Sequence, residues 1–152
     1  MNATPEQGTM YVTATVGEQL FGLPIARVQD VFVPEKLTRV PLAPPEVAGV
    51  LNLRGRIVTA IDMRRKLDLA PRAADKPVMA VGIDTRGESY GLLVDTVGEV
   101  LKFPSSACEP KPANLDDRWA RVASDVIRMD GQLLVVLDVD RVLDIRRAVA
   151  AA

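Results

Sequence analysis

Short runs of alternating apolar and small polar residues, interrupted by glycine or proline, recur along the chain. Residues 10–23 show such a run on either side of Gly17 and Glu18. Alternation with a period of two is typical of a half-buried β-strand, so this segment is predicted to form a β-hairpin. Residues 47–62 and 78–93 show the same arrangement around their own glycine-containing turns, which predicts two further hairpins.

Two pairs of segments repeat one pattern in the same order. Residues 19–31 align without a gap on residues 88–100, and residues 55–62 align on residues 131–138. The offsets, 91 − 22 = 69 and 131 − 55 = 76, indicate two similar halves and not a short-period solenoid. Because the repeat keeps the apolar pattern but not the polar residues, we expect the protein to present surfaces to partners instead of housing one reaction centre.

The remaining segments complete the predicted order of elements. Residues 25–32, behind Pro24, fit either a helix or a bent strand, and periodicity does not decide between them. Prolines predict irregular connections over residues 33–46 and 104–117. The other predicted elements are a continuation of the repeat over residues 94–103, strands over 120–129 and 132–137, a short helix over 63–67 capped by Asp62, and a helical turn over 138–143.

Many short strands with frequent turns favour a barrel or a sandwich. We therefore predict a mainly β fold of two intertwined five-stranded β-barrel subdomains with short helices. They would form a single domain over residues 10–145, with flexible tails at residues 1–9 and 146–152. At 152 residues and 48% hydrophobic content, the chain is long enough to bury an ordinary core without metal or disulfide.

Charge and composition exclude several classes of function. The 19 basic and 20 acidic residues are mixed along the chain, so no basic footprint for nucleic acid is present. Cys108 is the only cysteine, which excludes an intramolecular disulfide and a cysteine-rich zinc site. The start of the sequence shows no secretory signal, and no apolar run approaches the roughly 20 residues of a membrane span. We expect a cytoplasmic protein without direct membrane insertion.

The chain contains no histidine, the commonest general acid or base and the commonest metal ligand. The carboxylates that remain as catalytic candidates are Asp30, Asp62, Glu99 and Asp138, and each falls at the end of a strand or helix, where capping or ion pairing explains it. The glycines do not form a phosphate-binding loop. No catalytic residue, metal site or cofactor is predicted.

Arg54 is the polar residue that differs most between the two halves, because its counterpart is Asp130. Its side chain is either a solvated charge in a turn or the partner of a carboxylate such as Asp30, a geometry that suits arginine. The neighbouring apolar residues are either core or, if exposed together with Arg54, part of a partner site; they are Val28, Val31, Val47, Val50 and Leu53.

Residues 47–64 resemble the signature segment of the CheW family, the bacterial chemotaxis coupling proteins. Residues 21–31, 90–97 and 133–143 resemble further family segments, so the resemblance covers roughly residues 10–143. It implies two interlocked five-stranded barrels similar to SH3 domains and a scaffold role without catalysis. It also implies two partners: the cytoplasmic tip of methyl-accepting chemotaxis receptors, in a groove between the barrels, and the histidine kinase CheA, whose CheW-like regulatory domain pairs barrel to barrel.

The resemblance assigns receptor binding to Val28, Asp30, Gly49 and Arg54, with Asp30 and Arg54 as an acid–arginine pair. Further candidates for partner contact are Val31, Val50 and Leu53. The chain departs from the family pattern at Asp30, where glutamate is familiar, and at residues 118–123, which lack the usual glycine. We expect Gly49→Asp or Arg54→Ala to weaken receptor binding while leaving the fold intact.

Alternative functions remain open from the sequence. A CheW-like adaptor also fits a related pathway that controls pili, development or gene expression. A free-standing SH3-like or oligonucleotide-binding module fits the fold class, although the aromatic content of 4% and the lack of a basic groove disfavour binding to nucleic acid. A small hydrolase would need Asp62 and Asp138 as a catalytic carboxylate pair.

Overall fold

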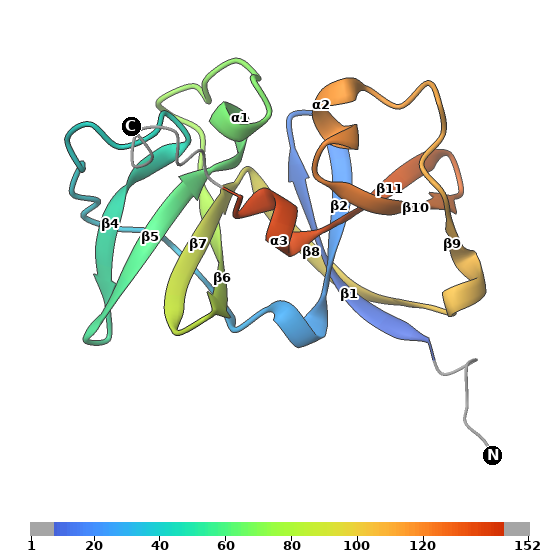
Figure 1. Ribbon diagram of the computed structural model, residues 1–152, viewed down its shortest axis with the longest axis horizontal. Helices are drawn as coiled ribbons and strands as arrows, with labels where there is room; N and C mark the ends of the chain where they lie inside the picture. The colour runs from blue at the N-terminus through green and yellow to red at the C-terminus, as the bar shows by residue number, and fades with distance from the viewer. Residues whose placement is uncertain (1–7, 145–152) are drawn as a thin grey trace.

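The computed structural model describes residues 8–144, whose strands form two β-sheets lying side by side (Figure 1). The six-stranded sheet contains, in spatial order, β8 (Thr96–Phe103), β1 (Thr9–Val16), β2 (Gln19–Pro24), β11 (Gln132–Leu137), β10 (Ala123–Met129) and β9 (Cys108–Glu109). The five-stranded sheet contains β3 (Asp30–Phe32), β6 (Met79–Thr85), β7 (Glu88–Val94), β5 (Arg56–Asp62) and β4 (Val47–Leu53). The connecting helices are η2 (Ile25–Arg27) and η3 (Ser105–Ala107), both 3-10, and α1 (Met63–Lys66), α2 (Asp117–Ala120) and α3 (Val139–Val142).

Each sheet combines strands from both halves of the chain. The hairpin of β1 and β2 joins the C-terminal strands through a parallel pairing of β2 with β11, and the hairpin of β6 and β7 joins the N-terminal strands through a parallel pairing of β7 with β5. Gly22 lies opposite Val136 and Gly91 lies opposite Ala60 in these pairings, so the two aromatic-glycine motifs occupy equivalent places. The prediction of two intertwined β-subdomains is confirmed.

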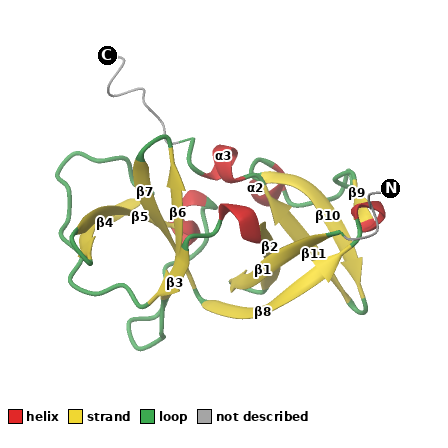
Figure 2. Ribbon diagram, turned by 90° about the horizontal axis from the view of Figure 1, so that it is seen from below, coloured by secondary structure: helices red, strands yellow, loops and turns green. Residues whose placement is uncertain are grey.

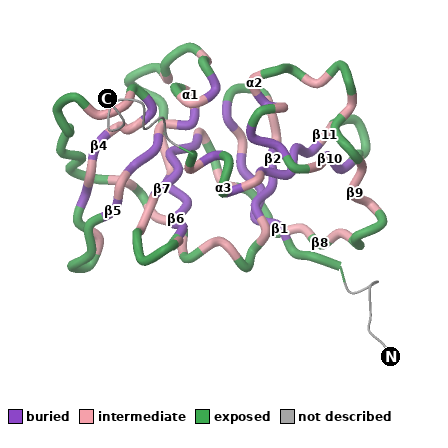
Figure 3. The backbone as a smooth tube through the Cα atoms, in the orientation of Figure 1, coloured by how far each residue is buried: buried purple, intermediate pink, exposed green. Residues whose placement is uncertain are grey.

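The largest hydrophobic core contains residues of both sheets. Phe21 of β2 packs there with Ile61 of β5 and Leu92 of β7, and Val142 of α3 belongs to the same cluster. Figure 1 shows α3 between the two groups of strands, and Figure 3 shows that the buried segments follow the strands while the turns are exposed. Smaller cores lie within each subdomain, one around Tyr11, Ile127, Leu134 and Val136 and one around Ala60, Ala80 and Leu93. The shared core therefore holds the two subdomains against each other.

Two predicted helices are present at equivalent points of the repeat. Asp62 ends β5 and caps α1, because its carboxylate accepts a hydrogen bond of 3.0 Å from Arg64 N. Asp138 follows β11 and caps α3, accepting a bond of 3.1 Å from Asp140 N. Both carboxylates thus satisfy backbone donors that a helix start leaves free.

Residues 25–32, which the sequence left undecided, contain both candidates: η2 is followed by β3. Residues 94–103 are expected to continue the repeat as residues 25–32 do, but their structure differs. They contain β8, an eight-residue strand that runs along the edge of the six-stranded sheet (Figure 2). β8 is long because β1 pairs with it from Thr9 to Thr15, whereas β3 pairs with β6 over three residues only.

The predicted strand over residues 120–129 begins too early. Asp117–Ala120 forms helix α2, and β10 starts at Ala123. Burial of Trp119 explains the difference, since its ring packs against Phe21 with a centroid distance of 5.8 Å. A helical turn capped by Asp116 directs the indole into the shared core, and this burial outweighs local strand propensity.

The two proline-rich connections contain little regular structure, as predicted. An isolated bridge between Thr38 and Val50 interrupts residues 33–46, and the short η3 and β9 interrupt residues 104–117. Of the expected tails, residues 1–7 and 146–152 lie outside the described residues. Within residues 8–144, no helix has the length and apolar character needed to cross a membrane.

Candidate functional site

The turn between β4 and β5 presents Arg54 at the end of the five-stranded sheet. Leu53 pairs with Arg56, so the loop consists of Arg54 and Gly55, with φ values of 52° and 87°. Two positive φ values identify a type I′ turn, the geometry whose twist matches a two-residue hairpin. Asn52 supports it, because its Oδ1 accepts a hydrogen bond of 2.9 Å from Gly55 N. The Arg54 side chain is 72% exposed.

Asp30 on β3 is the ionic partner of Arg54. The distance from Arg54 Nη1 to Asp30 Oδ2 is 3.6 Å, and the Asp30 side chain is 24% exposed. The pair that the sequence indicated is therefore present. Because its arginine is open to solvent, a pair of this kind contributes about 0–1 kcal/mol to stability. Its main consequence is geometric: it fixes a guanidinium and a carboxylate side by side on an accessible surface.

The other oxygen of Asp30 is held against the backbone of β6. Asp30 lies opposite Gly82 in the pairing of β3 with β6, and Gln29 N donates a 2.7 Å hydrogen bond to Gly82 O. Among residues 8–144, the buried Asp30 Oδ1 has no hydrogen-bond partner, and it occupies the place that a Cβ on Gly82 would take. The missing side chain at Gly82 thus lets the carboxylate reach Arg54.

Gly82→Ala is expected to displace the Asp30 carboxylate and to separate it from Arg54. The methyl group would meet the far end of one side chain, so the free energy of unfolding should change by about 1 kcal/mol or less. Binding to a receptor fragment, measured by pull-down, should fall as far as it does in Asp30→Ala. In the double variant the two losses should not add, and full additivity would contradict the positional role of Gly82.

Gly49 lies in a tightly packed part of the structure. It is buried, and a Cβ there would lie 2.5 Å from Thr38 O, a backbone atom. Thr38 and Val50 exchange backbone hydrogen bonds of 2.8 Å directly beside it, which fasten residues 33–46 to β4. The expectation that Gly49→Asp leaves the fold intact is wrong, because the backbone of Thr38 occupies the space of the new side chain.

We expect Gly49→Asp to lower the free energy of unfolding by about 2 kcal/mol, the range of overpacked sites. Gly55→Ala is the matched control, because Gly55 also has a positive φ but a Cβ there meets nothing within 4 Å. That variant should cost about 1 kcal/mol from backbone conformation alone. Denaturant unfolding of both proteins measures the difference; equal losses would show that the contact with Thr38 is not the cause.

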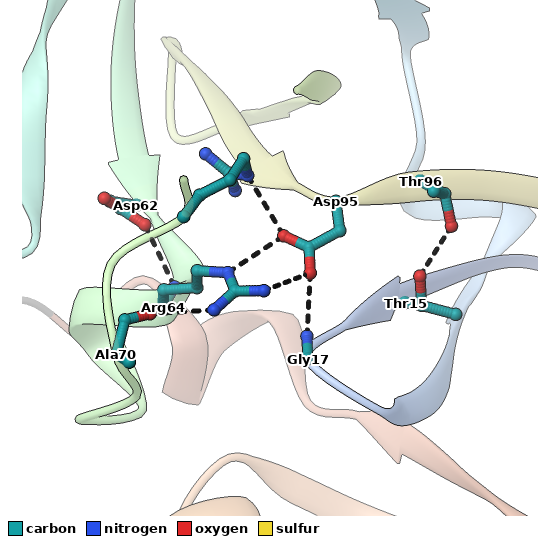
Figure 4. A network of polar contacts seen from close by, with 8 residues as sticks. Thr15, Gly17, Asp62, Arg64, Ala70, Asp95 and Thr96 are labelled. Carbon is teal, nitrogen blue, oxygen red and sulfur yellow. Dashed lines mark hydrogen bonds and ion pairs between the residues drawn. The ribbon is translucent and has the colours of Figure 1, made fainter. Parts of the chain in front are cut away.

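A second polar cluster, around Asp95, joins the two subdomains (Figure 4). Asp95 lies where the chain passes from β7 to β8. Its Oδ1 accepts hydrogen bonds from Arg64 Nε at 3.0 Å and Arg72 Nε at 3.1 Å. Its Oδ2 accepts bonds from Arg64 Nη2 at 2.6 Å and from Gly17 N, in the turn between β1 and β2, at 2.9 Å. One carboxylate therefore connects α1, the following loop and the opposite sheet.

The electrostatics of Asp95 follow from this arrangement. Burial of the Asp95 carboxyl would by itself raise its pKa, but the hydrogen bonds from Arg64, Gly17 N and Arg72 outweigh burial and hold the pKa below its ordinary value. The hydrogen bond to Asp95 in turn raises the pKa of Arg64. The Arg64 and Asp95 side chains are 19% and 18% exposed, so solvent screens this pair less than the pair of Arg54 and Asp30.

A family model described as the CheW-like domain matches residues 10–147 of this chain. The chain belongs to the CheW family. The match includes both subdomains and all three α-helices. The resemblance inferred from residues 47–64 is thereby confirmed.

Individual relatives agree with this membership. Chemotaxis protein CheW of Rhizobium meliloti (strain 1021) is 30% identical over 137 residues, which cover 89% of this chain and 87% of the relative. Chemotaxis protein CheW of Bacillus subtilis (strain 168) is 26% identical over 144 residues, covering 95% and 92%. The crystal structure of the scaffolding protein TtCheW from Thermoanaerobacter tengcongensis superposes with a TM-score of 0.80 at 24% identity, covering 91% of this chain and 94% of that one. This likeness confirms the fold of two SH3-like subdomains.

The other CheW-derived candidates occupy varied environments. Val28 follows η2 and packs at the margin of the shared core, while Val50 and Leu53 on β4 are half-buried. Val31 is exposed next to Asp30. Ile57, which is not a candidate from the sequence, is exposed on β5 three residues after Arg54.

The role of Asp95 is not predicted from the sequence, although the repeat reverses the charge at the position of its partner Arg64. Asp140 is the counterpart of Arg64 when Asp138 is aligned on Asp62. Asp140 forms its own ion pair with Arg27, at 3.3 Å between Arg27 Nη2 and Asp140 Oδ1. The charge at this position of the CheW repeat is therefore reversed between the halves, and so is the charge of its partner. The partners themselves do not correspond in the repeat, because Asp95 aligns on Ala26 and Arg27 aligns on Thr96, so the sequence shows the reversal only at residues 64 and 140.

No arrangement for metal binding is found among residues 8–144, where His, Cys, Asp and Glu form no group of three that could hold an ion. The carboxylates Asp62 and Asp138, considered as a catalytic pair, are each engaged as helix caps. The chemistry available at the CheW site is therefore ion pairing, hydrogen bonding and apolar contact.

Proposed function

We propose that this protein is a non-catalytic adaptor that couples methyl-accepting chemotaxis receptors to the histidine kinase CheA. The observation that carries the proposal is the match to the CheW-like domain over residues 10–147. The relatives with which it aligns along nearly their whole length are chemotaxis proteins. The protein acts in the cytoplasm and is recruited to receptor arrays at the membrane.

The receptor tip contacts the surface around Asp30 and Arg54. A fixed acid–arginine pair offers a partner both a donor fork and an acceptor, which gives orientation as well as attraction. Val31 follows Asp30 on β3 and Ile57 lies on β5 after the Arg54 turn, and both are exposed apolar residues. Arginine is typical of the few residues that dominate binding energy. Val28, Val50 and Leu53 are half-buried, and Gly49 supports this surface by holding residues 33–46 against β4.

An adaptor needs a second surface, and the connection of residues 33–46 supplies a candidate for the kinase. Leu42 is 94% exposed and has a φ of 64°. A cavity of about 390 Å³ lies beside it, lined in part by Val40, Pro44 and Ala48. An exposed leucine on a proline-stiffened loop loses little conformational freedom on binding and buries apolar area. This side of the five-stranded subdomain is therefore suited to barrel-to-barrel pairing with the CheW-like regulatory domain of CheA.

The composition supports a role without catalysis. The chain has no histidine, and three of the candidate carboxylates, Asp30, Asp62 and Asp138, are occupied by helix capping or ion pairing. A peptide-binding SH3-like module and an adaptor of a pathway for pili or development use similar surfaces. The relatives are chemotaxis proteins, which favours chemotaxis over both.

Co-sedimentation with receptor-containing membranes and CheA tests the proposal, with kinase autophosphorylation read in the same samples. An adaptor should pellet with both partners and raise the kinase activity above that of receptor and kinase alone. Binding to the kinase without receptor would leave a different input pathway as the function. Binding to neither would overturn the coupling role.

A further inference from the structure

A cavity of about 360 Å³ lies beside the Asp95 cluster, on a different part of the molecule from Asp30 and Arg54. Arg64 of α1, Arg72 and Lys76 of the following loop, and Asp95 and Thr96 at the start of β8 line it. Its volume is within the range of small-molecule sites, roughly 300–1,000 Å³. The adaptor role does not account for this cavity.

Positive charge exceeds negative charge on the walls of the cavity. Three cationic side chains and one carboxylate line it, a difference of 3 − 1 = 2. Both oxygens of the Asp95 carboxylate are already bound, Oδ1 by Arg64 and Arg72 and Oδ2 by Arg64 and Gly17 N. Asp62, the nearest acidic residue along α1, is occupied with Arg64 N. The surplus charge therefore favours an anion.

One donor of a residue that lines the cavity has no acceptor. Arg72 Nε is bonded to Asp95, but Arg72 Nη2 is buried without a hydrogen-bond partner among residues 8–144. The Arg72 side chain as a whole is 14% exposed. Arg64 differs, since its Nη1 also donates a 2.8 Å hydrogen bond to Ala70 O. A buried guanidinium nitrogen without an acceptor is unfavourable, which makes Arg72 the group that a bound oxyanion would satisfy.

We propose that this cavity binds a small phosphomonoester. The phosphate accepts hydrogen bonds from Arg72 and Lys76, a pairing of a guanidinium fork with a mobile ammonium that suits a dianion. The cavity is larger than a bare phosphate requires. Ala73 and Pro77 complete its wall and provide an apolar surface for the organic part of the ligand. The ligand would lie at the junction that Asp95 makes between the two subdomains.

Amide NMR titrations with inorganic phosphate and with glycerol 3-phosphate, at constant ionic strength, test this proposal. We expect saturable shifts at Ala73, Lys76 and Thr96, with tighter binding of glycerol 3-phosphate than of inorganic phosphate. Equal affinity for both would overturn the phosphomonoester class in favour of the free ion. Shifts that do not saturate, or that an equal concentration of acetate reproduces, would overturn the site itself.

Substitutions locate the binding site. Lys76→Gln removes an exposed charge outside the Asp95 cluster and should weaken glycerol 3-phosphate binding about fivefold, whereas Arg72→Gln should weaken it tenfold or more, roughly the scale of one charge-assisted contact. Arg56→Gln is the charge-matched control, because Arg56 pairs with Asp84 and does not line the cavity. Equal weakening by Lys76→Gln and Arg56→Gln would show a general charge effect. If Arg72→Gln fails to fold, the comparison of Lys76→Gln with Arg56→Gln still decides whether the cavity binds the ligand.

Discussion

Arg54→Ala is expected to weaken binding to receptor-containing membranes about tenfold while changing the free energy of unfolding by about 1 kcal/mol or less. The loss of affinity follows because the exposed guanidinium is the group of the Asp30 pair that a partner can reach. Stability changes little because the pair is exposed and the turn keeps its shape. Co-sedimentation at several receptor concentrations, together with denaturant unfolding, measures both quantities.

Arg86→Ala is the matched control for this prediction. Arg86 has the same φ of 52°, precedes Gly87 in the turn between β6 and β7, and is exposed. Both substitutions therefore remove an arginine from the same backbone conformation, but Arg86 forms no ion pair with Asp30 among the described residues. An equal loss of receptor binding in the two variants would show that total charge, and not the paired arginine, determines affinity.

Asp95→Ala is expected to lower the free energy of unfolding by about 3 kcal/mol, the cost of leaving a largely buried cation without its counterion. Arg64 would lose both of its bonds to the carboxylate, and the turn at Gly17 would lose its link to the other sheet. For a domain of this size the melting temperature should fall by roughly 10 °C. Thermal and denaturant unfolding measure the change.

Asp140→Ala provides the control in the other half of the repeat, where Asp140 stands at the counterpart of Arg64. Asp140 pairs with Arg27 in a much more exposed setting, so its removal should cost about 1 kcal/mol or less. Burial, and not the mere presence of an ion pair, would then explain why Asp95→Ala lowers the free energy of unfolding more than Asp140→Ala does. Equal losses in the two variants would contradict the special role of Asp95.

The pKa of Asp95 gives this stabilisation a pH dependence of definite sign. The folded pKa is depressed relative to an unfolded value of about 3.9, so the unfolded chain takes up a proton first as the pH falls. The contribution of the ionised Asp95 carboxylate to the free energy of unfolding is fully present above about pH 5 and is lost progressively below about pH 4. The difference in unfolding free energy between the parent protein and Asp95→Ala should shrink over that lower range. A difference that stays constant to pH 2 would contradict the ionic origin.

Local features of the fold could be predicted because their causes lie within a few residues. Alternation and a glycine in the turn predict the hairpin of β4 and β5, since cross-strand neighbours there are close in sequence. Asp62 and Asp138 predict helix starts for the same reason, because a capping carboxylate bonds to an amide two residues ahead. Within the candidate site, the ion pair of Arg54 and Asp30 could be suggested from residue type and repeat position alone.

Features that depend on distant partners could not be predicted in this way. Nothing near Gly49 in the sequence indicates that Thr38 O lies against it, and nothing near Asp30 indicates Gly82. Helix α2 delays the start of the predicted strand because the shared core, assembled from many segments, takes up Trp119. In each case the deciding contact joins residues that are distant in the sequence and that meet only when the sheets pack.

The sequence by itself determined the hairpins, the helix caps, the two-half repeat and the family, because periodicity, turn chemistry and motif are properties of contiguous residues. The tertiary structure alone decided which hairpin joins which sheet, through the parallel pairings of β2 with β11 and β7 with β5. It also decided that Asp95 bonds Gly17, Arg64 and Arg72 at once. These contacts arise from burial of a common core, which selects among pairings that the local pattern leaves equivalent.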